Sequence, residues 1–241
     1  MNASSLIRSL GVVALICASA AAAAPAGGQV VAGQASISAT PNLTTITQGS
    51  NATIINWQQF NIGRGEQVTF IQPTAQSTAL NRVIGGSAAQ IFGSLTANGR
   101  VFLVDPQGVV FGRTAVVDVG GLLASTLDIG DTDFMGGRYD FSSAGVGAVS
   151  NAGRLQARDG GFVVLAGSQV NNAGLVRARL GKTVLAAGSA LTLDFDGDGL
   201  ISYAVMRGAD GAQVLNTGRI AADGGLVALS AQAAGDAVQA V

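Results

Sequence analysis

A seven-residue motif that recurs in the C-terminal half places the narrowest limits on how this chain can fold. The motif reads NAGRLQA at 151–157, NAGLVRA at 172–178 and NTGRIAA at 216–222, and a short apolar segment follows each copy. The first two copies begin 21 residues apart and the last two 44, which we interpret as one period and two. A period near 21 built from short strands predicts a solenoid. The ladder of a leucine-rich repeat is missing, so a parallel β-helix is favoured.

Equivalent residues of a parallel β-helix form columns, because each coil stacks on the last at about 4.8 Å. The motif predicts one apolar column that points inward and one asparagine column at a corner. The members are Leu155, Val176 and Ile220 for the first column, and Asn151, Asn172 and Asn216 for the second. Asparagine suits a corner because it tolerates left-handed dihedral angles and its amide can bond along the stack. The alternative fold is a β-sandwich whose Asn-x-Gly turns recur by coincidence.

Composition supports the solenoid and excludes several classes of protein. The chain is 48% hydrophobic but only 5% aromatic, as expected for a narrow coil filled by small branched side chains. It has no histidine and a single cysteine, Cys17, which excludes a Ser-His-Asp triad, a histidine zinc site and a disulfide framework. Thirteen basic and fourteen acidic residues without a basic run give no reason to expect a nucleic-acid partner.

The first 24 residues have the pattern of a signal peptide. Arg8 supplies the positive charge, residues 9–24 carry none, and small residues at 20–24 offer cleavage sites. A lipoprotein is disfavoured because Ile16, before Cys17, is too large for that processing site. The remaining alternative is an uncleaved membrane anchor. We expect residues 1–24 to be removed on export, which leaves a chain without cysteine.

Five segments between residues 40 and 126 resemble the N-terminal secretion domain of filamentous-haemagglutinin-type exoproteins, the exported partners of two-partner secretion systems. They read NWQQFNIG at 56–63, LNRVIGG at 80–86, IFGSL at 91–95, ANGRVFL at 97–103 and GGLLAST at 120–126. The resemblance implies an all-β, right-handed parallel β-helix with N-terminal capping strands and extra-helical hairpins. It implies a two-partner secretion domain with its cap at 25–150, and continuing coils of a truncated solenoid at 151–241. It also implies passage through an outer-membrane pore protein with periplasmic recognition domains, in a Gram-negative cell.

Two tetrapeptides correspond to the signature turns of that family, Asn-Pro-Asn-Leu and Asn-Pro-Asn-Gly. The first corresponds to Thr40, Pro41, Asn42 and Leu43, and the second to Asp105, Pro106, Gln107 and Gly108. Both keep the residue pattern of a β-turn, with a side-chain acceptor at the first position and proline at the second. Gln107 departs most, because glutamine tolerates left-handed dihedral angles less well than asparagine. The turns are either contacts for the pore protein or turns needed only for folding.

An acidic segment at 194–201, DFDGDGLI, resembles the first half of a calcium-binding EF-hand loop. Asp194, Asp196 and Asp198 are weak calcium candidates, because the position of the bidentate glutamate is Val205. A solvated turn, in a loop inserted before Asn216, is the favoured interpretation. We therefore expect no metal and no cofactor. The tripeptide GKT at 181–183 lacks the glycine of a phosphate loop, so no nucleotide is expected.

These observations predict a non-enzymatic secretion domain that a cognate pore protein recognises and exports to the cell surface or medium. The exported coil would present an adhesin-like or haemagglutinin-like surface, with a host-surface or carbohydrate ligand as a further candidate partner. One alternative is a secreted polysaccharide lyase, in which the acidic segment would face Arg207, although few aromatic residues lie near it to stack sugars. The other alternative is a calcium-binding surface protein.

Overall fold

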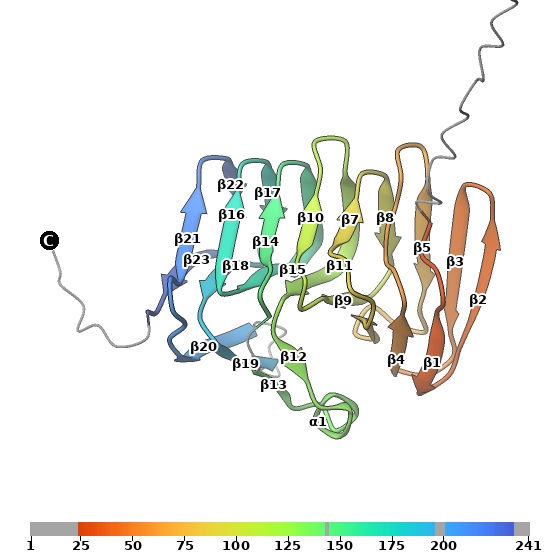
Figure 1. Cartoon of the computed structure of the whole chain (residues 1–241). Coiled ribbons are helices and arrows are strands. Elements are labelled where there is room, and N and C mark those ends of the chain that lie inside the picture. Colours follow the sequence, from red (N-terminus) through yellow and green to blue (C-terminus); the bar gives the residue numbers. More distant parts are fainter. Residues whose placement is uncertain (1–23, 143–144, 196–200, 234–241) are drawn as a thin grey trace, which may run out of the picture.

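Successive coils of the chain stack side by side into a parallel β-helix (Figure 1). The computed structural model describes residues 24–142, 145–195 and 201–233. The predicted signal peptide lies outside these ranges except for Ala24. The coils have three faces, which we number by the order in which each coil visits them.

Strands on each face pair in parallel with the equivalent strands of neighbouring coils. The first face contains β3 (Leu43–Gln48), β5 (Gln67–Ile71), β8 (Ser94–Ala97), β17 (Leu175–Ala178) and β22 (Arg219–Ala221). The second face contains β4 (Ala52–Trp57), β6 (Thr78–Val83), β9 (Arg100–Val104), β18 (Lys182–Ala187) and β23 (Leu226–Ala231). The third face contains β7 (Ala89–Ile91), β10 (Val109–Phe111), β14 (Ala148–Asn151), β16 (Gln169–Asn172) and β21 (Gln213–Asn216). Two long strands, β11 (Val116–Ser125) and β15 (Arg154–Gly167), bend around a corner and contribute to both the first and the second face.

An antiparallel cap closes the N-terminal end. Strand β1 (Gln29–Ala32) pairs with β4, and β2 (Ala35–Thr40) forms a hairpin with β3. In Figure 1 this hairpin lies at the right-hand end of the stack. The capping strands implied by the family resemblance are therefore present.

A small antiparallel sheet lies outside the coil. It consists of β12 (Asp128–Ile129), β13 (Tyr139–Ser142), β19 (Ala190–Phe195) and β20 (Ile201–Arg207). The single turn of helix α1 (Asp131–Met135) belongs to the same region, and in the described part of the chain no helix is long and apolar enough to cross a membrane. Phe134 of α1 and Phe141 of β13 pack on Phe102 of the second face, so this region covers the outer side of that face.

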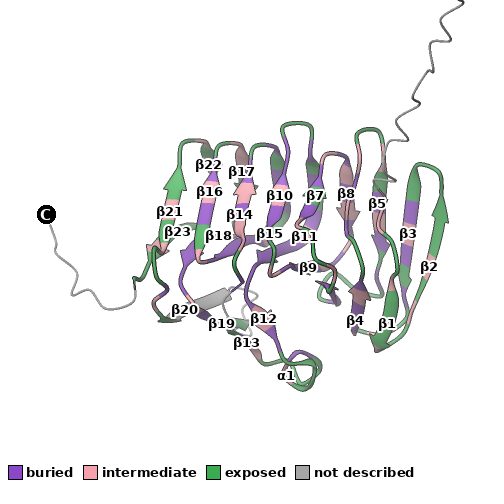
Figure 2. Cartoon of the chain, in the orientation of Figure 1, coloured by how far each residue is buried: buried purple, intermediate pink, exposed green. Residues whose placement is uncertain are grey.

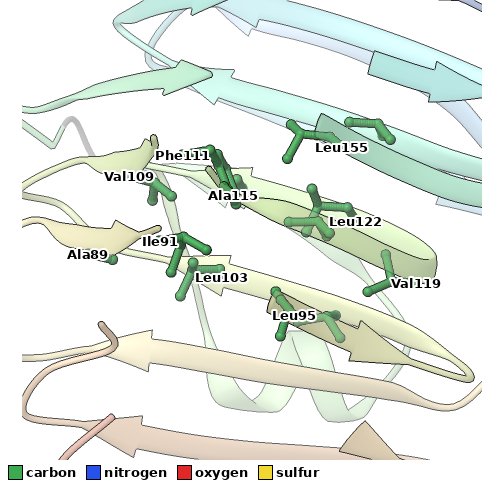
Figure 3. Close-up of a cluster of buried hydrophobic side chains, with 14 of the residues drawn as sticks. Ala89, Ile91, Leu95, Leu103, Val109, Phe111, Ala115, Val119, Leu122 and Leu155 are labelled. Atoms are coloured by element: carbon green, nitrogen blue, oxygen red, sulfur yellow. The ribbon is translucent and has the colours of Figure 1, made fainter. Parts of the chain in front are cut away.

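The second face is consequently apolar on both sides. In β9, Val101 and Leu103 belong to the core inside the coil, whereas Phe102 and Val104 belong to the cluster beneath the outer sheet. Figure 3 shows the inner core, and Figure 2 shows that burial concentrates in the middle of the stack. A sheet buried on both sides produces an unbroken apolar run instead of an alternating pattern, which explains VFLV at 101–104.

The repeat motif has the register that the sequence predicts. Leu155 lies opposite Val176, and Val176 lies opposite Ile220. Leu155 and Val176 are fully buried, and Ile220 is partly buried against the same core. The prediction of an all-β parallel β-helix with a cap and extra-helical strands is confirmed.

The interpretation of the 44-residue interval as two periods is wrong. Strand β16 pairs directly with β21, and Asn172 lies opposite Asn216, so the interval is a single coil. The additional residues form β19 and β20, which leave the coil and pair with β13 in the outer sheet. A hairpin that leaves the stack adds residues to the chain without adding a coil.

A stack of tight turns at the corner between the first and second faces contains one strained residue. Among the described residues, Leu180 is the sole non-glycine with a positive φ, 53°. Glycines with φ near 70° occupy the neighbouring turns, Gly160 and Gly224. Leu180 is also 53% exposed, so little packing compensates for its backbone conformation.

We predict that Leu180→Gly stabilises the chain by about 0.5–1 kcal/mol, because relief of left-handed strain exceeds the added freedom of the unfolded chain. Urea unfolding measures the difference. Leu180→Ala, which keeps a β-carbon at the same φ, is the control and should stay close to the original chain. A glycine variant less stable than the alanine variant would contradict the prediction.

Candidate functional site: two proline turns and an asparagine ladder

The first proline turn (40–43) forms the tip of the β2–β3 hairpin. Thr40 pairs with Leu43 across the hairpin, and Pro41 and Asn42 form the connection. The Thr40 hydroxyl donates a hydrogen bond to the carbonyl oxygen of Leu43, at 3.2 Å. All four residues are exposed, including Leu43 at 39%. The turn therefore offers its side chains to solvent at the N-terminal end of the stack.

The second proline turn (105–108) has the opposite environment, because the carboxylate of Asp105 is fully buried. Its Oδ1 accepts a hydrogen bond from the Gln107 N–H at 2.9 Å, and its Oδ2 accepts one from the Ala89 N–H at 2.8 Å. The Gly108 N–H closes the turn on the Asp105 carbonyl oxygen at 3.0 Å. Asp105 thus joins the corner of one coil to strand β7 of the preceding coil.

The following coil lies directly against the second proline turn. The Gly147 N–H donates to the carbonyl oxygen of Pro106 at 3.1 Å. A β-carbon at Gly147 would come within 2.1 Å of the Gln107 carbonyl oxygen, so no larger residue fits without a backbone shift. The second turn is therefore held between its two neighbouring coils.

The expected conformational penalty at Gln107 does not arise. The positive φ of the second turn, 122°, belongs to Gly108, and Gln107 has a negative φ. Glutamine in place of asparagine therefore costs no left-handed strain at this position.

Burial raises the pKa of Asp105 from 3.8 to about 6, and the hydrogen bonds from Gln107 and Ala89 oppose that rise. Desolvation dominates because the carboxylate has no contact with water. In the folded chain the Asp105 carboxylate therefore takes up a proton near pH 6, whereas in the unfolded chain it does so near pH 3.8.

The three motif asparagines form a continuous ladder at the end of the third face. The Asn151 Nδ2 donates to the Asn172 Oδ1 at 2.8 Å, and the Asn172 Nδ2 donates to the Asn216 Oδ1 at 2.7 Å. The Asn151 Oδ1 also accepts from the Gly153 N–H, at 2.9 Å. Each bonded amide thus supports both its own turn and its neighbour.

Sequence reasoning missed a second amide ladder, in the N-terminal coils. The Gln72 Nε2 donates to the Gln48 Oε1 at 3.0 Å, and the Gln72 Oε1 accepts from the Gly99 N–H at 2.9 Å. Both glutamine side chains are buried. A signal was available, because Gln48 ends β3, Gln72 directly follows β5, and their separation of 24 residues equals the offset between paired residues of these two strands.

Sequence reasoning also missed the role of Arg82, although it lies in one of the family-like segments. Its Nε donates to Asp128 at 2.8 Å, its Nη1 bonds Asp131 at 2.7 Å, and its Nη2 donates to the Ile129 carbonyl oxygen at 2.6 Å. Arg82 therefore fastens β12 and α1 to the second face. The three partners lie 46 residues or more along the chain, so no local pattern could reveal them.

The structure describes only part of the calcium candidate. Asp194 is exposed near the end of β19, and Asp196 and Asp198 lie outside the described residues. Among the residues that the structure describes, no group of three acidic, cysteine or histidine residues could hold a metal ion. The two proline turns and the ladders do not converge on one pocket, so the candidate site is a set of stacked corners.

A capped β-helix with a covered second face and two proline turns defines a class of protein, the secretion domains of two-partner exoproteins. A family model described as "TPS secretion domain" matches residues 21–241. The chain belongs to this family. Its exoproteins are exported through the periplasm and secreted to the cell surface or medium by a two-partner system.

Two relatives and one solved structure resemble this chain. A heme/hemopexin-binding protein of Haemophilus influenzae strain Rd is 41% identical over 155 residues, which are 61% of this chain and 17% of that protein. A second Haemophilus influenzae heme/hemopexin-binding protein is 45% identical over 103 residues, 43% of this chain and 11% of that protein. The crystal structure of the HMW1 secretion domain from Haemophilus influenzae matches with a TM-score of 0.78 and 31% identity, over 86% of this chain and 57% of that one. This chain thus spans a small fraction of its curated relatives.

We predict that Asp105 makes the chain more stable as the pH falls from about 7 to about 4. The folded state holds a proton that the unfolded state releases in this range, so the free energy of unfolding rises on acidification, by up to about 3 kcal/mol. Asp105→Asn removes this contribution. Urea unfolding should therefore show that the original chain gains stability relative to the variant as the pH falls.

The control is Gln107→Ala, which changes the same turn without a titratable group and should show a difference that does not depend on pH. A pH-independent difference for Asp105→Asn would contradict the raised pKa.

We also predict that Asn172→Ala destabilises the chain by about 2–3 kcal/mol, because it leaves the amides of Asn151 and Asn216 without their partner. Asn171→Ala, one residue earlier on the same strand and half-buried, should cost less than about 0.5 kcal/mol. Urea unfolding compares the two. Equal costs for both variants would show that the ladder contributes nothing specific.

Proposed function

We propose that the first proline turn contacts the cognate outer-membrane transporter, whereas the second serves folding. One observation carries the distinction: residues 40–43 are all exposed, but the Asp105 carboxylate is fully buried between coils. A partner can reach the first turn in the folded domain and cannot reach Asp105 without separating coils.

Strand β2 offers a second element for the same contact. It ends the sheet and pairs, among the described strands, with β3 alone. Most of its residues are exposed, so its outer edge can accept a further strand. Addition of a strand from a periplasmic domain of the transporter would place that domain beside the first proline turn. The turn and the edge together form one continuous recognition element.

The rest of the chain supports export by its manner of folding. Beyond the cap, each strand on the three faces pairs only with the equivalent strands of neighbouring coils, so coils can form one at a time as they emerge from a pore. Folding on the far side opposes return of the chain by mass action. The sole cysteine of this sequence lies within the predicted signal peptide, so residues 25–241 contribute no disulfide that could form before they are threaded. We assign recognition to 25–150 and additional coils to 151–241.

We propose no catalytic activity for this chain. Its family is a secretion domain, which supports an export role over the polysaccharide lyase considered above. Arg207 is exposed on β20, and two of the three acidic residues that would face it lie outside the described residues. The stacked coils instead suit the presentation of an exposed, adhesin-like surface.

We predict that the double variant Pro41→Ala, Asn42→Ala lowers affinity for the purified periplasmic domains of the transporter by roughly tenfold, with a matching loss of secretion. Its urea midpoint should remain close to that of the original chain, because both side chains are exposed. Binding by calorimetry and the amount of chain in the medium provide the two measurements.

Pro73→Ala is the matched control, because Pro73 is also exposed, in the loop between β5 and β6. It should leave binding and secretion unchanged. Undiminished binding by the double variant would overturn the assignment of the first turn, and equal losses in the control would show that any turn proline matters.

A further inference from the structure

The outer side of the first face is exposed to solvent, whereas the outer side of the second face is covered by the small antiparallel sheet. Its strands alternate between inward and outward side chains, and the outward residues form a column that crosses five coils in register. The members of this column, from β5 to β17, are Thr69, Thr96, Asp118, Gln156 and Arg177. The hydroxyl groups of Thr69 and Thr96 lie 3.0 Å apart. The column is therefore a polar stripe parallel to the axis of the stack.

A groove follows this stripe. Two adjoining hollows, of about 340 and 650 Å³, share Asp118 and Arg158 in their walls. The smaller hollow extends to Thr69 and Asn98, and the larger extends to Arg179. Four coil steps of about 4.8 Å separate the two ends, which gives a length of about 19 Å. The groove suits an extended ligand that lies along the axis.

Arginine side chains gather at the larger hollow. Arg158, Arg177 and Arg179 all line it, although the whole chain has a net charge of −1. Arg179 is held by Asp159 through its Nε and Nη2 atoms. Arg158 and Arg177 are exposed, and within the described ranges neither guanidinium group has a hydrogen-bond or ion-pair partner. Two guanidinium groups are therefore available to an anionic ligand in a groove of fixed geometry.

We propose that this groove binds a linear anionic glycan, in which carboxylate or sulfate groups alternate with neutral sugars. The acidic groups would bond Arg158 and Arg177, whose planar donors match them in a bidentate geometry. Hydroxyl groups of the neutral sugars would donate to Asp118 and bond the amide of Gln156. The inference does not depend on the transporter contact, because the groove and the first proline turn are separate surfaces.

Three features favour a glycan over other polyanions. The groove runs over the interior of a sheet whose backbone is paired, so an acidic peptide could not add a strand there. No aromatic side chain is exposed in its walls, so single-stranded nucleic acid and uncharged sugars lack a stacking platform, a protein partner lacks an anchor, and recognition depends on charge and hydrogen bonds. Asp118 and Asp159 would repel the closely spaced phosphates of a nucleic acid, whereas the neutral sugars of a glycan can bond them.

The test is calorimetric titration of the purified chain with a hyaluronan octasaccharide, in which glucuronate alternates with neutral N-acetylglucosamine. We predict binding that weakens as salt rises from about 50 to 200 mM, and no binding of uncharged dextran. Arg158→Gln with Arg177→Gln should lower affinity about tenfold or more. Arg113→Gln with Arg207→Gln removes the same charge outside the groove and should lower it no more than about twofold.

Asp118→Ala distinguishes sugar recognition from simple charge attraction. Loss of its negative charge would strengthen a ligand held by charge alone, whereas loss of its acceptor weakens a glycan that donates hydroxyl groups to it. We expect lower affinity for the octasaccharide. The urea midpoints of all variants should match the original chain, because the replaced side chains are exposed.

Several results would overturn the proposal. These are no binding of the octasaccharide, equal losses in the two arginine double variants, or higher affinity after Asp118→Ala. Tighter binding of polyglutamate or of single-stranded DNA than of the octasaccharide would assign the groove to another class of anion.

Discussion

Stacking of one coil on the next by parallel backbone pairing is the interaction on which the rest of this structure depends. The spacing of about 4.8 Å brings the corners of neighbouring coils so close that some positions exclude any side chain. A β-carbon at Gly174 would lie 2.2 Å from the Gly153 carbonyl oxygen, and one at Gly218 would lie 2.2 Å from that of Gly174. The glycine of each repeat motif is thus required by its neighbour in the stack as well as by its own turn.

The same spacing determines how polar groups are buried. The N-terminal coils place the Gln48–Gln72 ladder after the first face, whereas the C-terminal coils place their asparagine ladder after the third. The last residue of the third-face strand is Ile91 in β7 and Phe111 in β10, and it changes to asparagine at Asn151 in β14. This change in the filling of the corner coincides with the boundary that we propose between 25–150 and 151–241. The inner hydrophobic core itself continues across that boundary, from Ile46 to Leu185.

The sequence predicted what repeats locally and missed what the chain brings together over long distances. The in-register column of Leu155 and Val176 follows from a 21-residue offset, and the structure confirms it. The 44-residue interval could not be interpreted correctly, because a hairpin that leaves the coil and a second coil add similar numbers of residues. The attachment of the outer sheet through Arg82 was hidden because its partners lie far along the chain. Burial of Asp105 was equally hidden, since its environment comes from the coils on either side.

In a solenoid, contacts along the axis and surfaces parallel to the axis can serve different functions of an exported domain. Contacts along the axis, such as those of Asp105 and the asparagine ladder, hold coils together and allow them to form in sequence. The N-terminal end carries the hairpin with the first proline turn, which stays exposed to a partner after the coils have formed. The outer surfaces of the three faces, which lie parallel to the axis, need not change while the coils form. Because the first face repeats with every coil, a groove on it lengthens as coils are added, so export and ligand binding can share one architecture without sharing residues.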